Sequence, residues 1–91
     1  MEEKPTNNRL VLYRKRMNLS QKEVAAMLGL KNAAVLSHYE RGTSQPSLQR
    51  ALALEIVYRV PVAFLFGELY EKIKAEIHNK ESHVYTSKDP K

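Results

Sequence analysis

The sequence predicts an all-α fold, and three observations support that prediction. Apolar residues recur at intervals of three and four, which is the spacing of an amphipathic helix and not the alternation of a strand. The chain of 91 residues contains only three glycines and four prolines, so long segments run without a helix breaker. Most of these few residues stand between the periodic segments, where they punctuate the helices.

Size and composition allow one compact domain. At 91 residues, of which 43% are hydrophobic, the chain can bury a single core. It has no cysteine, which excludes disulfides and thiolate metal sites. Residues 1–5 lack the apolar stretch of a secretory signal. The nearly unbroken apolar run over residues 60–66 is far shorter than the roughly 20 residues of a membrane span. We therefore expect a cytoplasmic protein without a membrane segment.

The first helix is expected over about residues 8–17. Leu10, Tyr13 and Met17 form an apolar stripe at helical spacing, so this face should contact the core. The opposite face is basic and should remain in water.

The second helix has the clearest start in the sequence. Ser20 and Glu23 form a capping box, in which each side chain accepts a hydrogen bond from the backbone amide of the other residue. Gly29 should end the helix, since glycine adopts the left-handed cap conformation without steric cost. The expected buried stripe consists of Val24, Met27 and Leu28.

The third helix should begin with Asn32 as its N-cap and run to Arg41, with Gly42 as its C-cap. Leu36 and Tyr39 are its inward residues. This register leaves one face to the solvent, made of Asn32, Ala33, Ala34, Ser37 and His38.

A fourth helix should follow Ser47 as N-cap and stop before Pro61, because a residue that precedes proline avoids the α conformation. Pro61 itself suits the first turn of a fifth helix. The apolar residues expected along the fourth helix are Leu48, Ala51, Leu52, Leu54 and Val57.

Beyond the domain of residues 8–66, we expect a C-terminal helix over residues 67–79 and a flexible tail over residues 80–91. The helix is indicated by apolar residues at intervals of four, and the tail by its polar, aperiodic sequence. Whether Gly67 interrupts the last helix is left open. The residues at intervals of four are Leu69, Ile73 and Ile77.

The positive charge is concentrated in the first two thirds of the chain. Residues 9–59 contain nine Lys or Arg and three Glu, a net charge of +6, whereas the chain from residue 60 onward is neutral. A basic segment of this kind is typical of a module that faces a polyanion, although many solvated helical surfaces are equally basic.

Several short motifs lie at a fixed spacing along the first two thirds of the chain. They are Leu19-Ser20-Gln21, Glu23-Val24-Ala25, Leu28-Gly29-Leu30, and Tyr39-Glu40-Arg41-Gly42 before Pro46-Ser47-Leu48. Their joint spacing over residues 8–66 resembles the Cro/C1-type (XRE) helix-turn-helix family, which includes phage repressors of the lambda type. The resemblance implies a five-helix, lambda-repressor-like bundle whose second helix lies across the DNA backbone and whose third helix enters the major groove. It implies a sequence-specific transcriptional regulator, by expectation a repressor.

The sequence departs from the family pattern in the region that should read DNA. The stretch from Gly29 to Glu40 is one residue longer than usual, and we place the extra residue in the turn at Lys31. Ala33, Ala34 and Val35 stand where many relatives have longer polar side chains.

By this resemblance, Gln21 and the segment from Arg41 to Ser44 should hold phosphates, while the outer face of the third helix should read base edges. Three of these residues also have plain structural interpretations. Gln21 can be an ordinary first-turn residue, Asn32 a pure N-cap, and His38 a solvated surface side chain. The expected DNA-binding set is Gln21, Lys31, Asn32, Ala33, Ala34, Ser37, His38, Arg41, Thr43 and Ser44.

The resemblance also implies that Arg14 pairs with Glu40 and thereby holds the third helix against the first. The alternative is two independent surface charges, a kind of pair that contributes little to stability.

The partners expected are double-stranded DNA, with a pseudo-palindromic operator, and a second copy of the chain. Leu69, Ile73 and Ile77 should mediate the homodimer, and a dimer would read two half-sites about 34 Å apart. The same stripe could instead fold back on the first helix of its own subunit. A second functional hypothesis is an antitoxin-type interaction module whose C-terminal segment binds a partner protein.

No constellation for catalysis, a metal or a cofactor is found. His38, His78 and His83 lack the spacing of metal ligands, and Ser20 and Ser37 have no base positioned by a motif. We therefore expect no enzymatic activity, no metal and no cofactor.

Overall fold

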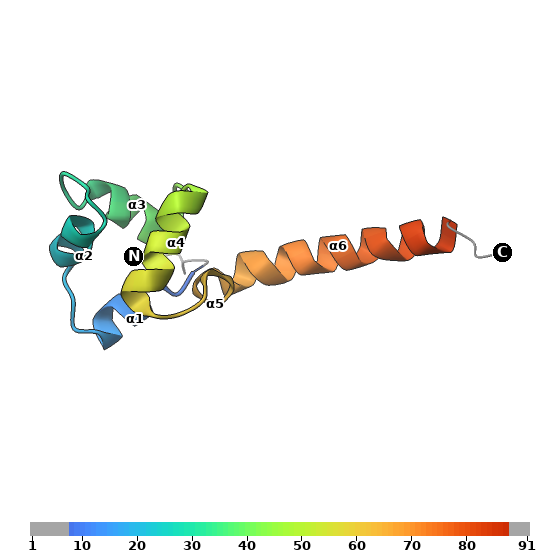
Figure 1. Ribbon diagram of the computed structural model, residues 1–91, viewed down its shortest axis with the longest axis horizontal. Helices are drawn as coiled ribbons and strands as arrows, with labels where there is room; N and C mark the ends of the chain where they lie inside the picture. The colour runs from blue at the N-terminus through green and yellow to red at the C-terminus, as the bar shows by residue number, and fades with distance from the viewer. Residues whose placement is uncertain (1–7, 88–91) are drawn as a thin grey trace, which may run out of the picture.

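The computed structural model describes residues 8–87, which form six helices and no strand (Figure 1). The first five helices pack into a compact bundle, and the sixth leaves it as a single long rod. The predicted all-α, five-helix bundle with a C-terminal helical extension is confirmed. The helices are α1 (Leu10–Arg16), α2 (Gln21–Met27), α3 (Ala34–Arg41), α4 (Leu48–Tyr58), α5 (Val62–Leu65) and α6 (Gly67–Ser87).

The bundle has one hydrophobic core, to which each of the first five helices contributes at least one side chain. Four leucines and Val24 in this core have essentially no exposed surface. Burial of side chains of this size stabilises the fold by about 1.5–3 kcal/mol each. The core residues are Leu10, Val24, Leu36, Tyr39, Leu54, Tyr58, Leu65 and Phe66.

The ends of α2 follow the local signals in the sequence. The Ser20 hydroxyl accepts from the Glu23 amide at 3.0 Å, and the Glu23 carboxylate accepts from the Ser20 amide at 2.8 Å. Gly29 has φ of 76°, and the next amide, of Leu30, donates to the Ala25 carbonyl at 2.9 Å. This is the hydrogen bond of a Schellman motif, so both the capping box and the glycine cap are confirmed.

The start of α3 differs from the prediction. The helix begins at Ala34 with Ala33 as its N-cap, so Asn32 is not the N-cap residue. The Asn32 side chain nevertheless accepts a hydrogen bond from the Ala34 amide at 2.9 Å. At the other end, Gly42 closes the helix with φ of 75°, as predicted.

Met27, which was expected on the buried stripe of α2, is exposed, and so are two of the apolar residues of α4. Met27 is 55% exposed, Leu48 76% and Leu52 47%. A seven-residue helix buries only a narrow stripe, and in α2 Val24, Ala25 and Leu28 fill it. In α4, Leu54 and Tyr58 take the inward positions instead.

The junction between α4 and α5 depends on a residue that the sequence did not reveal. The helix ends at Tyr58, before Val60 and Pro61 as predicted. The Glu55 carboxylate then accepts the Val62 amide at 3.0 Å and so satisfies the first free donor of α5.

The helical path is interrupted at Phe66, which lies between the end of α5 at Leu65 and the start of α6 at Gly67, so the glycine does not break the last helix. The Arg9 guanidinium lies where a side chain at position 67 would have to stand, with one nitrogen close to the position of a Cβ. Arg9 also donates to the Phe64 carbonyl at 2.6 Å, and its backbone amide donates to the Leu65 carbonyl at 2.8 Å. The start of α6 is thus held by the residue that precedes α1.

The C-terminal helix is longer than predicted. It does not end near residue 79 but continues to Ser87, so the expectation of a flexible tail is wrong for residues 80–87. No glycine or proline follows Gly67 within the helix, and Val84 continues the apolar stripe seven residues after Ile77. The rest of the expected tail, residues 88–91, lies outside the described residues. Despite its 21 residues, α6 is too rich in charge to cross a membrane, and no other helix within residues 8–87 qualifies either.

A buried carboxylate joins α1, α2 and α3. Glu40 is 3% exposed, and the Arg14 guanidinium donates to its two oxygens at 2.6 and 3.2 Å. The Gln21 amide donates a third hydrogen bond to this carboxylate at 2.8 Å. The hydrogen bond to Glu40 raises the pKa of Arg14 despite the opposing effect of its burial. The pair that the resemblance implied therefore lies in the interior and not on the surface.

Tyr58 packs beside this group with its hydroxyl buried. Among the described residues, that hydroxyl has no hydrogen-bond partner. Burial, together with the negative charge of Glu40, raises the pKa of the phenol well above its usual range.

Arg14→Met should lower the free energy of unfolding by about 3–5 kcal/mol, because it leaves the Glu40 charge buried without its cation. The neighbouring change Lys15→Met is the control and should cost less than about 0.5 kcal/mol, since Lys15 is exposed. Urea denaturation of both variants measures the difference. Equal midpoints would mean that the buried pair does not stabilise the fold.

Tyr58→Phe should change how stability depends on pH in alkaline solution. In the unfolded chain the phenol ionises near pH 10, whereas burial keeps it neutral in the folded protein, so the parent loses stability as pH rises above about 10. The variant should lose less over the same interval. Tyr85→Phe, at a residue that is 66% exposed, should behave as the parent does. Thermal melts between pH 8 and 11 make the comparison, and identical profiles for all three proteins would contradict it.

Candidate nucleic-acid interface

Helices α2 and α3 and the turn between them form the end of the molecule opposite to α6 (Figure 1). The connection comprises residues 28–33, with Lys31 exposed at its centre. Val24 and Ala25 of α2 and Leu36 and Tyr39 of α3 face the core. Glu40 is buried as well, and the other face of α3, with Ala34, His38 and Arg41, is exposed to the solvent.

Polar side chains at the C-terminal half of α3 are linked to one another. Arg41 donates to the Ser37 hydroxyl at 3.0 Å, and the Nδ1 atom of His38 lies 3.0 Å from the Thr43 hydroxyl. The loop that follows is held by the Thr43 amide, which donates to the His38 carbonyl at 3.0 Å. Four of the predicted residues, Ser37, His38, Arg41 and Thr43, are thus brought together on one surface.

The His38 ring has a second polar neighbour. A nitrogen of the Arg41 guanidinium lies 3.4 Å from the Nδ1 atom of His38, and the Thr43 hydroxyl also donates to the His38 carbonyl at 3.2 Å. These contacts tie the imidazole to Arg41 and to the loop after α3.

The N-terminal half of α3 is apolar and open. Ala34 is exposed, while Ala33 is half-buried at the N-cap and Ser37 is half-buried one turn further along. Val35, which the sequence analysis did not select, is 36% exposed beside Ala34. The exposure of Val35 goes with the start of α3 at Ala34, and the spacing of the motifs did not predict that start.

Gln21 lies at the first position of α2, half-buried, with its amide nitrogen bonded to Glu40. This contact is not part of the sequence prediction, and it gives the residue a structural role. Asn32 and Ser44 are exposed on the turn before α3 and on the loop after it, respectively.

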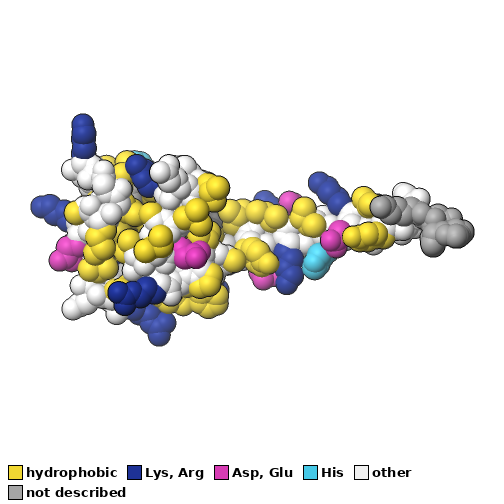
Figure 2. Space-filling model, in the orientation of Figure 1, with side chains coloured by type: hydrophobic (Ala, Val, Ile, Leu, Met, Phe, Trp, Pro, Cys, Tyr) yellow, Lys and Arg dark blue, Asp and Glu magenta, His cyan; other side chains and the backbone are white. Residues whose placement is uncertain are grey.

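The charge of this end of the molecule is positive. Arg14 and Glu40 neutralise each other inside the bundle, so the net charge of +6 over residues 9–59 is carried by the other side chains. Figure 2 shows Lys and Arg side chains projecting from the end formed by α2 and α3, whereas α6 carries both signs of charge. Lys22, Lys31 and Arg41 are exposed on this end.

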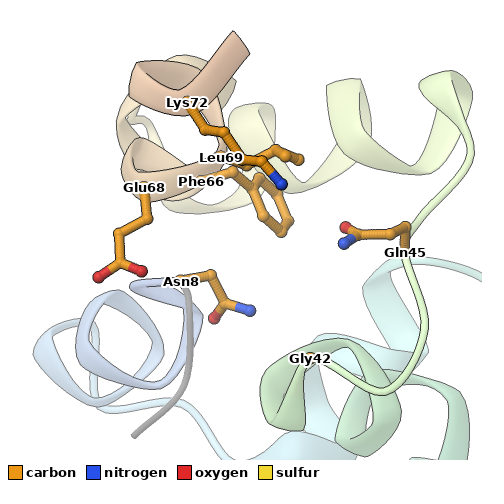
Figure 3. Close-up of a pocket in the computed structure, with 7 residues that line it drawn as sticks. All are labelled: Asn8, Gly42, Gln45, Phe66, Glu68, Leu69 and Lys72. Carbon is orange, nitrogen blue, oxygen red and sulfur yellow. The ribbon is translucent and has the colours of Figure 1, made fainter. Parts of the chain in front are cut away.

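A hollow of about 280 Å³ lies where the start of α6 meets α1 and the loop after α3 (Figure 3). Phe66 and Leu69 form its apolar part, while Asn8, Gln45 and Glu68 lie at its edge. Its volume is just below the range of 300–1,000 Å³ that is usual for small-molecule sites. The hollow is the joint between the bundle and α6, and it lies apart from the exposed face of α3.

Within residues 8–87, no three His, Asp or Glu side chains are placed to hold a metal ion. A family model described as helix-turn-helix matches residues 10–65, which span α1 to α5 and leave α6 outside. No curated protein matches the chain. The matching model covers more than half of the chain and describes a DNA-binding regulatory domain rather than an enzymatic one. The chain therefore belongs to the Cro/C1-type (XRE) helix-turn-helix family and is a sequence-specific DNA-binding transcriptional regulator.

Proposed function

We propose that the protein is a repressor that binds a pseudo-palindromic operator as a homodimer and acts without catalysis. The observation that carries the proposal is the exposed surface of α3, where Ser37, His38, Arg41 and Thr43 are linked by hydrogen bonds. Such linked side chains are held in place before DNA arrives, which lowers the entropy cost of binding. A dimer seated on the duplex excludes other proteins from the same site, and this is the mode of repression we infer.

The division of roles within the surface follows from side-chain chemistry. The methyl groups of Ala34 and Val35 suit contact with a thymine methyl. The imidazole of His38 can donate to or accept from base edges in the major groove. With few polar groups toward the bases, part of the specificity should come from DNA shape.

Contacts to phosphates are assigned to the rim of this surface. Lys31, Arg41 and Ser44 are exposed there, and Gln21 lies half-buried at the start of α2. Asn32 and Ala33 complete the proposed set at the turn before α3. None of these rim contacts carries sequence information, so they position α3 in the groove.

The homodimer is proposed to form through α6. No residue of this helix is buried, and Leu69, Ile73 and Ile77 are between 37% and 50% exposed. An apolar stripe on a helix that leaves its own domain needs another surface to cover it. Folding back on α1 is not the arrangement of this structure, in which α6 points away from the bundle (Figure 1).

A second candidate function follows from the same exposed stripe. An antitoxin-type protein would present α6 to a partner protein and not to its own copy. A chain that stays monomeric at high concentration while it binds DNA would favour this candidate over the homodimer.

Binding to duplex DNA should depend strongly on salt. Each phosphate contact releases counterions, so the logarithm of the association constant should fall linearly with the logarithm of salt concentration, with a slope of several units. Fluorescence anisotropy on an operator selected from random DNA, at four salt concentrations, measures the slope. A flat response, or no binding at low salt, would refute the proposal.

Ala34→Glu should abolish operator binding, because a carboxylate at this exposed position would face the acceptors and phosphates of the groove. Ala75→Glu, the same change at an exposed position of α6, is the control and should bind as the parent does. His38→Ala should relax the preference at one or two base pairs in a repeated selection. Parent-like binding by Ala34→Glu would mean that this face of α3 does not enter the groove.

Ile73→Glu combined with Ile77→Glu should convert a dimer into a folded monomer that binds the operator more weakly. The control pair, Ala75→Glu with Asn79→Glu, adds the same charge to the opposite face of α6. Sedimentation equilibrium gives the mass, and a thermal melt shows that the bundle remains folded. A dimer that survives the first pair, or a monomeric parent, would contradict association through α6.

A further inference from the structure

The apolar stripe of α6 has the spacing of a helix that pairs with another helix. Five residues of α6 follow one another at intervals of three, four, three and four positions, which is the heptad pattern of a paired helix. They are Tyr70, Ile73, Ile77, Lys80 and Val84. The four apolar members are 47–53% exposed. Figure 2 shows hydrophobic side chains along α6, with charged side chains between them.

Charged and polar residues flank this seam in an ordered way. Lys74 comes directly after Ile73, and Glu81 comes directly after Lys80. Both therefore lie on the same side of the seam formed by the five residues of the heptad pattern. Glu76 and His83 lie on the other side. Residues in these flanking positions decide which partner and which orientation a helix accepts.

A parallel pair would bring like charges together. In a parallel two-stranded arrangement, a residue on one flank faces the residue five positions later on the opposite flank of the other helix. Glu76 of each copy would then face Glu81 of the second copy, and this contact would occur twice.

An antiparallel pair reverses the outcome, because equivalent flanks then face each other. With Ile73 opposite Val84, Lys74 of each copy lies beside Glu81 of the second copy, and Glu76 lies beside His83. Lys80 lies opposite Ile77, from where its long side chain can bring the ammonium group toward Glu76 of the second copy.

The register is also selective. A shift of one heptad in one direction places Lys74 beside Lys74 and Glu76 beside Glu76 of the second copy. The opposite shift places Glu81 beside Glu81. The register that pairs Ile73 with Val84 is the one of these three that joins opposite charges, and it overlaps the two helices over residues 70–87.

We propose that α6 binds α6 of a second copy of this chain in an antiparallel pair, with Ile73 opposite Val84 and Lys74 beside Glu81. The proposal rests on the homodimer of the proposed function and defines its geometry. At a rise of 1.5 Å per residue, the two Gly67 residues lie about 34 Å apart along the pair, with a DNA-binding bundle beyond each of them. The centres of the half-sites would therefore be more than one turn of DNA apart.

Disulfide trapping tests the orientation. Because the chain has no cysteine of its own, only the introduced cysteines can form a disulfide. Ile73→Cys and Val84→Cys are prepared in separate full-length chains and oxidised alone and as an equal mixture. In the antiparallel pair, position 73 lies about 16 Å along the axis from position 73 of the second copy, too far for a disulfide. Only the mixture should therefore give a covalent dimer on a non-reducing gel.

The other outcomes of this experiment are each decisive. Covalent dimers from the single variants would overturn the antiparallel orientation while leaving the homodimer intact. No covalent dimer in any sample, with a parent that sediments as a dimer, would overturn the register. A parent that sediments as a monomer at every concentration would overturn both this proposal and the dimer of the proposed function.

Reversing the charge of Glu81 gives an independent test, because the dimer should become weaker in one orientation and tighter in the other. Glu81→Lys faces Lys74 in the antiparallel pair and should weaken the dimer about tenfold, whereas in a parallel pair it would face Glu76 and strengthen it. Glu71→Lys changes the net charge equally but lies away from the seam, so its dimer should match the parent. Dissociation constants from sedimentation equilibrium decide the sign, and a tighter Glu81→Lys dimer would refute the proposal.

Discussion

The buried carboxylate of Glu40 is the constraint on which the rest of the structure depends. A charge this deep in a small bundle is costly unless donors surround it, and here Arg14 and Gln21 supply three hydrogen bonds from two other helices. Because Glu40 points inward, the rotation of α3 is fixed. At 3.6 residues per turn, an inward Glu40 together with Leu36 turns Ala34, His38 and Arg41 toward the solvent. A contact inside the protein therefore decides which residues of α3 are exposed.

Helix α1 connects the two ends of the molecule through this contact. Arg14, in the last turn of α1, is bonded to Glu40 of α3. The side-chain amide of Asn8, which precedes α1, donates to the Tyr39 carbonyl of α3 at 2.9 Å. At the same place, Arg9 is bonded to the Phe64 and Leu65 carbonyls and covers Gly67. One short helix therefore fixes α3 and the root of α6 together. The direction of α6 is therefore fixed relative to the exposed face of α3.

The features that the residues alone, without the family resemblance, predicted correctly have local causes. The capping box at Ser20 and the glycine caps at Gly29 and Gly42 each depend on a few consecutive residues, so their motifs are sufficient to identify them. Three of the features that were wrong or missed depend on contacts between distant segments or on the context of a whole helix. Met27 is exposed because neighbouring residues already fill the narrow core, and the bond from Gln21 to Glu40 spans nineteen positions. The extension of α6 to Ser87 was missed because its polar composition resembles that of a tail, although nothing in it breaks a helix.

The absence of buried side chains along α6 links its folding to its association. No residue of α6 is buried, and a single helix in water gains little stability beyond that of its own hydrogen bonds. Covering its stripe would add tertiary contacts and helical order in the same step. Protein concentration would then control both helix content and dimer population, and a dimer would bind two half-sites more tightly than two separate monomers. Occupancy of the operator by such a dimer would rise steeply with the abundance of the protein.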